Sequence, residues 1–495
     1  MILAILGVPL FAGALAFFLR SDRLRHALLL AAAAIHASLT AATWTVRPAP
    51  LFGGWLALDA PERLFLSITS ALFLATGVYA VGYLKREGVG KRPDIEEGFL
   101  FPNAPEATFV GCLLIFLSTM SLVITARHVG LMWVGIEATT LASAPLIHYH
   151  RHHRSLEAAW KYLVLCSVGI AVALLGNFFL VVAAGPVTDR ISSMTVTELA
   201  AHAGQLDSKW LKAAFLLLFV GYGTKMGLAP LHAWLPDAHS EAPSLVSALL
   251  SGALLNCAFL AILRIHGVCA AAGLADFSQD LFVLFGIVSM AVAAVFIVGQ
   301  TDYKRMLAYS SVEHMGIAMF GAGVGGIAGF GALLHLVNHS LTKAMLFLLA
   351  GNLLGAYKTK GASQVTGALR RLPITGALWL AGFFAITGSP PFGPFVSELS
   401  ILKGLLDAGR FALAALYLLL LLIVFVAMAM VFLRMVHGAP PGGAAHDLPL
   451  PPVRERLSAV LPPAALGLAV LVLGLYVPGA LRDAIDSALK TLRMY

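Results

Sequence analysis

The chain has 495 residues, of which 59% are hydrophobic and only 12% are charged, and its mean hydropathy is +0.87. Because soluble domains carry about 25% charged residues, this composition excludes a soluble enzyme and predicts an integral membrane protein. The formal net charge of +8 comes mostly from lysines and arginines in loops, which argues against nucleic acid as a partner.

Apolar runs of about 20 residues, the length that crosses a bilayer, recur along the chain. They predict an all-α membrane protein with about fourteen transmembrane helices. In chain order these are expected near residues 1–19, 24–46, 64–83, 107–126, 129–148, 160–184, 211–234, 244–265, 281–298, 306–321, 326–353, 373–406, 411–435 and 460–477. Lysine and arginine are richer in alternate loops, which predicts that both termini lie on the periplasmic side of the inner (plasma) membrane.

Three segments do not have the character of spans. Residues 185–208 contain Thr195 and Glu198 at the spacing of a capping box, which predicts a short interfacial helix. Residues 437–452 are rich in proline and glycine and are expected to form a loop. Residues 481–492 place leucine and isoleucine on one helical face, so we expect this tail to lie on the membrane or on a partner.

Several ionisable residues fall inside the expected spans, where a central charge costs at least about 2.5–3.5 kcal/mol on insertion scales. Such residues typically mark an ion path, a proton relay or a paired site. They are Glu137, Lys225, the trio His335, His339 and Lys343, and Glu398.

The trio His335, His339 and Lys343 has a spacing of four residues, which places it on one helical face with about 6 Å of axial rise per step. Histidine changes protonation near neutral pH and has two ring nitrogens, so this row is typical of a proton relay. Alternatively, each histidine only forms hydrogen bonds to a neighbouring helix.

Lys225 and Glu137 are expected to act as a switch pair. Burial favours the neutral form of each side chain and an opposite charge favours the charged form, so moving one partner changes the proton affinity of the other. The alternative is a static ion pair that only ties two helices together. Pro230, five residues after Lys225, is expected to break the helix beside this charge.

A second break is expected at residues 388–394, GSPPFGP, shortly before Glu398. Two interrupted helices in corresponding places are typical of inverted-repeat transporters with a site near the midplane of the membrane. We therefore predict two inverted five-helix repeats, with Lys225 and Glu398 as matching charges. The predicted domains are 1–106 (helices 1–3), 107–265 (first repeat, helices 4–8), 266–436 (second repeat, helices 9–13) and 437–495 (loop, last helix and amphipathic tail).

The four cysteines contain no CxxC pair, so neither an iron–sulfur cluster nor a zinc site is indicated by them. We expect no cofactor, no metal and no catalytic residue on this chain. Four histidines cluster beside two arginines at an expected helix end, where they either bind a metal or form an interfacial structural cluster, and the position favours the second. They are His148, His150, His152 and His153.

Four motifs between residues 107 and 435 carry a resemblance to a known family. They are GYGTKMGLAPLHAWLPDAHSEAPSLVSALLSG, TDYKRMLAYSSVEHMG, HLVNHSLTKAMLF and PPFGPFVSELSIL. Together they resemble the proton-conducting antiporter-like membrane subunits, which include three subunits of respiratory complex I, Mrp antiporter subunits and membrane subunits of energy-converting nickel–iron hydrogenases. IEATTLASAPLI, SSVEHMG and LSGALLNCAFLAILR most resemble component F of hydrogenase-4 and of formate hydrogenlyase-type complexes.

The resemblance implies roles for individual residues. Positions that match the proton path of the family are Glu137 on its fifth helix, Lys225 on its seventh, the central relay residues Lys304, His335 and His339, and the terminal charge Glu398 on its twelfth. His232 and His239 match positions that connect the channel to one surface, although His232 can instead cap the broken helix. Asn256 stands where complex I subunit M has a lysine, so the chain departs from the family at that step.

The resemblance implies a non-catalytic, proton-translocating membrane subunit of a redox-driven complex, either hydrogenase-4/formate hydrogenlyase-like or complex I-like. Its partners would be other membrane-arm subunits and a peripheral arm that carries iron–sulfur clusters with nickel–iron or flavin and quinone chemistry. Alternatives are an Mrp-type Na+/H+ antiporter subunit and an accessory that couples the proton gradient to a soluble uptake protein. A passive anchor would instead tolerate neutral replacement of Glu137, Lys225 and Glu398.

Overall fold

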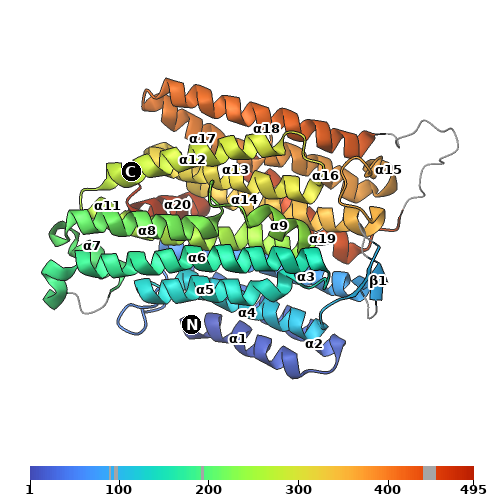
Figure 1. The fold of residues 1–495 in the computed structure, drawn as a ribbon, viewed down its shortest axis with the longest axis horizontal. Coiled ribbons are helices and arrows are strands. Elements are labelled where there is room, and N and C mark those ends of the chain that lie inside the picture. The colour runs from blue at the N-terminus through green and yellow to red at the C-terminus, as the bar shows by residue number, and fades with distance from the viewer. Residues whose placement is uncertain (88–90, 94–97, 191–193, 439–452, 495) are drawn as a thin grey trace.

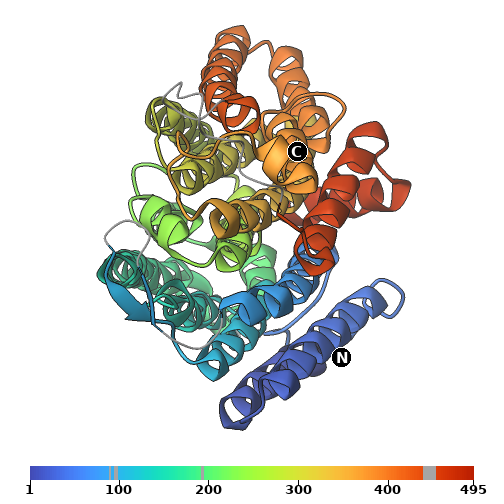
Figure 2. The same ribbon diagram turned by 90° about the vertical axis from the view of Figure 1, so that its right-hand side faces the viewer.

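The computed structural model describes residues 1–87, 91–93, 98–190, 194–438 and 453–494, which fold into a bundle of helices. The long helices follow the longest axis of the molecule (Figure 1), and the end-on view shows the α1–α2 hairpin at one edge of the bundle (Figure 2). The first half comprises α1 (Ile2–Phe18), α2 (Asp22–Ala42), α3 (Ala60–Glu87), α4 (Glu106–Thr125), α5 (Val129–Ile147), α6 (His153–Ala183), α7 (Val196–Ala201), α8 (Ser208–Met226), α9 (Leu235–Glu241), α10 (Ser244–Leu249) and α11 (Leu255–Ala271). The second half comprises α12 (Ala275–Ile297), α13 (Tyr303–Val324), α14 (Gly326–Tyr357), α15 (Ala368–Arg371), α16 (Pro373–Ile386), α17 (Gly393–Asp407), α18 (Phe411–His437), α19 (Leu457–Leu475) and α20 (Gly479–Leu492).

Each expected span coincides with one helix or with helices separated by a short break. In the described part of the chain, ten helices are long and apolar enough to cross a membrane, with α10 and α11 taken as one, and α1 and α16 are shorter apolar helices. The all-α, multi-pass membrane fold is therefore confirmed. The count of fourteen crossings and the two inverted repeats remain predictions.

Short elements lie at the two ends of the bundle. Strands β1 (Lys91–Pro93) and β2 (Leu100–Pro102) pair antiparallel between α3 and α4; three-residue strands are too short for a periodic sequence signal. At the other end, 3₁₀ turns η1 (Gly185–Arg190) and η2 (Ala203–Gln205) flank α7, and Thr195 Oγ1 accepts a hydrogen bond from the Glu198 backbone N–H at 3.3 Å. The expected capped helix is thus confirmed, whereas most of the expected loop, residues 439–452, lies outside the described residues.

The C-terminal helix α20 packs against the chain itself. Its apolar face buries Ile485, Ala488 and Leu489 against α3, α11 and α14. The expectation that the tail lies on the membrane or on a partner is therefore wrong. Sequence periodicity identifies an apolar face but not the surface that covers it, and here three helices of the same chain provide that surface.

Both expected helix breaks are present. Helix α8 ends at Met226 because Gly227 adopts the left-handed conformation at φ +80°. Pro230 comes three residues later, so the glycine ends the helix and the proline only prevents its immediate continuation. Helix α16 ends at Ile386, where Gly388 has φ +61°. Lys225 therefore precedes its break, while Glu398 follows the second one.

A single π-helical turn, η3 (Leu250–Leu254), joins α10 to α11 in the centre of the bundle. Gly252 lets this turn approach α14, because a Cβ at Gly252 would lie 3.0 Å from the carbonyl oxygen of Ser340. Nearly every residue of α10, η3, α11 and α14 is buried. Single π turns occur frequently at functional sites, and this turn was not expected from the sequence.

Candidate functional site

Helix α14 carries the expected row of titratable side chains through the core. His335, His339 and Lys343 are all fully buried. The Lys343 ammonium donates hydrogen bonds to the carbonyl oxygen of Leu307 at 2.7 Å and to the hydroxyl of Ser310. The row therefore faces α13, which supplies acceptors for its buried charge.

His314 of α13 completes this row and was missed as a site residue. His314 Nδ1 lies 2.8 Å from His335 Nε2, and the ring centroids of His314 and His339 are 5.1 Å apart. His314 therefore bridges two histidines whose positions are one helical turn apart on α14. The signal was present in the quoted motif SSVEHMG, where a glutamate and a histidine stand side by side within an expected span.

Glu313, the other half of that signal, is also buried and was likewise not proposed. Its Oε2 atom has no hydrogen-bond partner among the described residues. A buried carboxyl group next to His314 adds one more titratable group to the same part of α13.

Glu398 of α17 lies at one end of this row. Its carboxylate packs against Gly388 in the second break, and ligand atoms of His314, His335 and Glu398 all lie within 4.8 Å of one another. Ser397, the preceding residue, hydrogen-bonds through its Oγ to His335 Nδ1 at 3.0 Å. The fold thus brings together residues more than 60 positions apart in sequence, and the broken helix delivers a carboxyl group to two imidazoles.

Lys225 occupies a separate polar site in the first half. Its Nζ donates to Tyr162 Oη at 2.6 Å and to Thr140 Oγ1 at 2.8 Å, and it lies 4.4 Å from the centroid of the Tyr162 ring. Ser143 continues this hydroxyl cluster at 2.6 Å from Tyr162 Oη. None of these three hydroxyl-bearing residues was proposed from the sequence, because side chains on different helices gather here only after folding.

Glu137 does not form an ion pair with Lys225 within 4.0 Å in the described structure. Glu137 Oε1 instead accepts a hydrogen bond from Ser167 Oγ at 2.8 Å. The static ion pair that was the alternative interpretation is therefore not made here, and the proposed switching role of the two residues remains a prediction.

Asn256 connects the first half to the central row. Its Nδ2 donates to Ser340 Oγ at 2.8 Å and to the carbonyl of Gly252 in the π turn at 3.0 Å. Ser251, in the same turn, lies 2.8 Å from Ser311 of α13. At the position where a lysine was expected from the family, the structure has a neutral contact to the residue next to His339.

Lys304 lies at the start of α13, ten residues before His314, which corresponds to about 15 Å of helix axis. Its Nζ donates to the carbonyl oxygens of Ser240 at 2.9 Å and Ala242 at 2.6 Å, at the end of α9. The lysine therefore binds the C-terminal carbonyls of a short helix, an arrangement that a helix dipole favours.

His232 lies in the break between α8 and α9, and His239 lies within α9. His239 of α9 is fully buried and stacks on Phe347 with a centroid distance of 5.1 Å, and neither ring nitrogen has a hydrogen-bond partner among the described residues. His232 lies in the turn before α9 near Tyr309, with a centroid distance of 6.2 Å, and its Nδ1 has no partner there. The alternative in which the His232 side chain caps the broken helix finds no support in these contacts.

A cavity of about 660 Å³ opens at one end of the bundle. Figure 1 shows that β1 and α15 lie at this end. Residues from several helices line it, among them Tyr83, Glu241, Ser244, Lys304 and Asn352. Lys304, which the resemblance places in the central relay, is thus at the wall of an open space. His239 lies five residues before Ser244, on the short helix that ends at this wall.

The histidine cluster at residues 148–153 forms part of the same end of the bundle. His150 hydrogen-bonds through Nδ1 to Asn103 Oδ1 at 2.8 Å, and His152 Nδ1 accepts from the Ser155 backbone N–H at the start of α6. Burial, together with a nearby arginine, lowers the pKa of His148 below its usual 6.5. These contacts agree with the interfacial structural interpretation.

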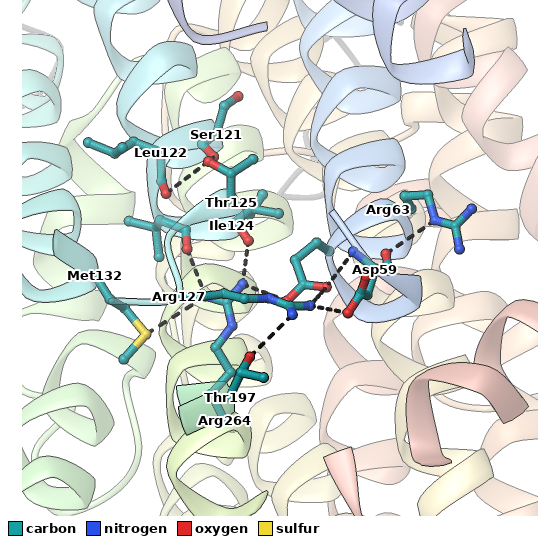
Figure 3. Close-up of polar contacts among 12 residues, drawn as sticks. Asp59, Arg63, Ser121, Leu122, Ile124, Thr125, Arg127, Met132, Thr197 and Arg264 are labelled. Carbon is teal, nitrogen blue, oxygen red and sulfur yellow. Dashed lines mark hydrogen bonds and ion pairs between the residues drawn. The ribbon is translucent and has the colours of Figure 1, made fainter. Parts of the chain in front are cut away.

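At the opposite end, a buried ion-pair network ties the N-terminal helices to α11 (Figure 3). Arg264 Nη2 lies 3.1 Å from Glu62 Oε1, and Arg127 Nη2 lies 2.6 Å from Asp59 Oδ2 and 3.2 Å from Glu62 Oε2. Arg264 also donates to the carbonyl of Val123 at 2.9 Å. No sequence motif indicated this network, because its members come from three segments that are far apart in the sequence.

These features define a polytopic membrane protein whose core carries a connected row of titratable side chains. Over residues 126–424 the chain matches the family described as NADH:quinone oxidoreductase/Mrp antiporter, TM, and it belongs to this family. The resemblance stated from the motifs is therefore confirmed.

Named relatives agree with this assignment. The chain is 36% identical over 429 residues to a hydrogenase-4 component F homolog of Methylacidiphilum infernorum, covering 86% of both chains. It is 31% identical over 372 residues to NADH-quinone oxidoreductase subunit N of Desulforudis audaxviator, covering 72% of both. A chain of the Mrp complex from Dietzia sp. DQ12-45-1b shares the fold with a TM-score of 0.84, at 21% identity, over 99% of this chain and 97% of that one.

Proposed function

We propose that this chain moves protons across the membrane as a non-catalytic subunit of a redox-driven complex of the hydrogenase-4 or complex I type. The observation that carries the proposal is the row from Lys343 through His339 and His314 to His335 and Glu398, which is buried along its length. Ionisable groups inside a membrane are costly, and a connected row of them is characteristic of proton relays.

The donors and acceptors of the hydrogen bonds around His335 and His314 indicate which nitrogen atom can accept a proton. Ser397 Oγ donates to the carbonyl of Pro394 at 2.9 Å, so it accepts from His335 Nδ1. His335 Nε2 is then the acceptor for His314 Nδ1–H, which leaves His314 Nε2 without a proton and without a partner. This assignment follows from the network of donors and acceptors. A proton from Glu398 or from His339 thus has a vacant acceptor in His314 Nε2.

Transfer can proceed through the histidines because each imidazole takes a proton on one nitrogen and releases one from the other. His314 and His339, whose ring centroids are 5.1 Å apart, share no direct hydrogen bond in the described structure, so this step requires a bridging water molecule. The charge on Lys343 sets the energy of a proton on His339, four residues away on the same face. The row therefore functions as a set of coupled sites with Glu398 at one end.

Coupling to the first half is assigned to Lys225 and Glu137. The hydroxyl groups of Tyr162 and Thr140 hold the Lys225 ammonium apart from Glu137, so a shift of the lysine toward Glu137 exchanges hydroxyl partners for a carboxylate. The break after Met226 gives the end of α8 freedom for that shift. Asn256 and Ser340 provide the contact between the first half and the row.

Proton uptake is assigned to the cavity at the β1–α15 end, through Ser244, Lys304 and His239, and release to the side of Glu398. This end is the predicted cytoplasmic side, and both termini lie toward the other end (Figure 1). The domain division at residues 106, 265 and 436 and the two inverted repeats belong to the same proposal. Peripheral partners with iron–sulfur and nickel–iron or flavin and quinone chemistry would supply the electrons.

The test is proton pumping by the intact complex in sealed vesicles, with electron transfer to a soluble acceptor measured in parallel. Lys225→Ala and Glu398→Gln should abolish pumping while electron transfer continues. Lys403→Ala is the matched control, because Lys403 pairs with Asp407 at 2.6 Å on an exposed face of α17. Full pumping in the Lys225→Ala complex would refute the assignment.

A second candidate is an Mrp-type Na+/H+ antiporter subunit, favoured by the shared fold with the Mrp complex chain. It predicts that vesicles without any redox substrate exchange Na+ for H+ under an imposed gradient. The redox-driven function predicts no exchange under those conditions unless electrons flow. Identification of the subunits that co-purify with the chain separates the two candidates further.

A further inference from the structure

His314, His335 and Glu398 form a cluster of potential metal ligands within the proposed proton path. Two imidazoles and one carboxylate are a ligand set that zinc uses in proteins. Na+ and Mg²⁺ are hard cations, and hard cations prefer a shell of oxygen atoms instead. In the described residues this is the one group of three or more histidine, cysteine or acidic side chains whose ligand atoms come this close.

The geometry is close to that of a zinc site. Ligand atoms of the three residues all lie within 4.8 Å of one another. Zinc with bonds of about 2.0–2.1 Å holds tetrahedral ligands about 3.3 Å apart, so each ligand atom needs to move by less than about 1 Å. His314 Nδ1 and His335 Nε2 are already 2.8 Å apart.

Two further observations point to a ligand. His314 is 1% exposed, and its Nε2 has no hydrogen-bond partner among the described residues, so Nε2 can take up the proton that Nδ1 releases when Nδ1 binds the ion. The second ring nitrogen of His335 is held by Ser397 at 3.0 Å, and such an outer partner typically orients a metal-binding histidine. Glu398 retains 7% exposure beside the break, so the carboxylate is the accessible member of the cluster.

We propose that His314, His335 and Glu398 bind one divalent transition-metal ion, with Zn²⁺ as the best fit, and that the bound ion blocks the proton row. The blocking role rests on the proposed function, whereas the binding site does not. Metal ligands must be deprotonated, so the ion takes the place of the proton between the two imidazoles. The bound ion and the shared proton therefore exclude each other at this position.

Direct binding tests the site without any transport assay. The full-length chain, purified through a tag free of histidine and placed in lipid nanodiscs, is equilibrated with Zn²⁺ and the bound metal is counted. Binding at the surface histidines is removed by replacing His148, His150, His152 and His153 with glutamine in all samples. We expect one bound zinc ion in this background, and the visible spectrum of a tetrahedral site when Co²⁺ is used instead.

His314→Gln, His335→Gln and Glu398→Gln should each lose the bound ion. Ser397→Ala should weaken binding by about 10–100-fold, as expected for an outer partner. His266→Gln is the matched control, because His266 is also buried, with Nε2 unpartnered in the described structure, but lies outside the cluster. If His266→Gln behaved like the three ligand variants, or if none of the three lost zinc, the metal site would be overturned.

Transport then separates the two proposals. Zinc should inhibit pumping by the intact complex, and Ser397→Ala should relieve that inhibition. If the chain binds no zinc while the ligand variants still lose pumping, the metal site is wrong and the proton row stands. If zinc occupies the cluster and pumping continues at full rate, the metal site stands and the proton row through these residues is wrong.

Discussion

Replacement of His314 by glutamine removes a titratable group that joins the two histidines of α14 in the described structure. His335 and His339 are separated by about 6 Å of helix rise, and His314 contacts both, at 2.8 Å between ring nitrogens and at 5.1 Å between ring centroids. Glutamine can keep one hydrogen bond but cannot accept a proton and release another. We therefore expect pumping to fall by at least about 10²-fold, the lower end for loss of a proton-transfer group.

The stability cost of this variant should be small. Glutamine fills much of the same volume, and one lost buried hydrogen bond costs about 1 kcal/mol. The assay is dye-detected acidification of vesicles that contain the complex, divided by the rate of electron transfer, so that a loss of assembly is not counted as a loss of pumping. His266→Gln makes the same chemical change at another buried histidine, which is bonded to Ser278 at 2.8 Å, and should pump normally. Pumping within twofold of wild type in His314→Gln, in a fully assembled complex, would show that the row does not pass through His314.

Other expected outcomes concern stability and are measured by thermal unfolding of the purified chain. Gly252→Ala places a Cβ 3.0 Å from the α14 backbone, so the free energy of unfolding should fall by about 1–3 kcal/mol. Gly355→Ala is the control, because Gly355 is an exposed helical residue with open space around it. The free energy of unfolding should not fall in this variant, since alanine favours a helix over glycine by up to about 1 kcal/mol. Arg264→Met removes one of the two arginines that pair with the buried carboxylate of Glu62, and breaking such a pair lowers the free energy of unfolding by about 3–5 kcal/mol. A decrease of less than about 1 kcal/mol would show that this ion-pair network contributes little to stability. Burial lowers the pKa of His128 and of His148 below 6.5. Below about pH 6.5 the unfolded chain therefore binds more protons than the folded chain, and the free energy of unfolding decreases as the pH falls. Above about pH 6.5 this contribution to stability is fully present. An unfolding temperature that stays constant between pH 7.5 and pH 5 would contradict this sign.

The two helix breaks could be predicted from local sequence, whereas the contacts made beside them could not. Glycine and proline clusters located both of them, because a residue with positive φ or without an amide hydrogen ends a helix wherever it stands. The same clusters did not reveal that Glu398 would meet His314 and His335. That contact depends on how α13, α14 and α17 pack, and no spacing within one helix encodes it.

The hydrogen-bond partners of Lys304 also could not be predicted from the sequence. Its position in a motif placed it in the central relay, and the structure shows it at the start of α13, bound to the carbonyl oxygens of Ser240 and Ala242 at the end of α9. A lysine has a long side chain, and its partner is decided by whichever acceptors lie within reach after folding. The α20 helix was misplaced for a related reason, since an apolar face binds lipid, partner or its own chain with similar energy per unit of area.

The sequence by itself determined that the chain is a multi-pass helical membrane protein, where its helices break, and which charged residues lie within its apolar helices. It did so because a bilayer imposes helix length and penalises charge strongly enough to appear in a single sequence. Only the tertiary structure decided that His314 links His335 to His339, that Lys225 rests among hydroxyl groups, and that Glu398 reaches the imidazoles. These contacts join residues from separate helices, and their geometry arises from packing alone.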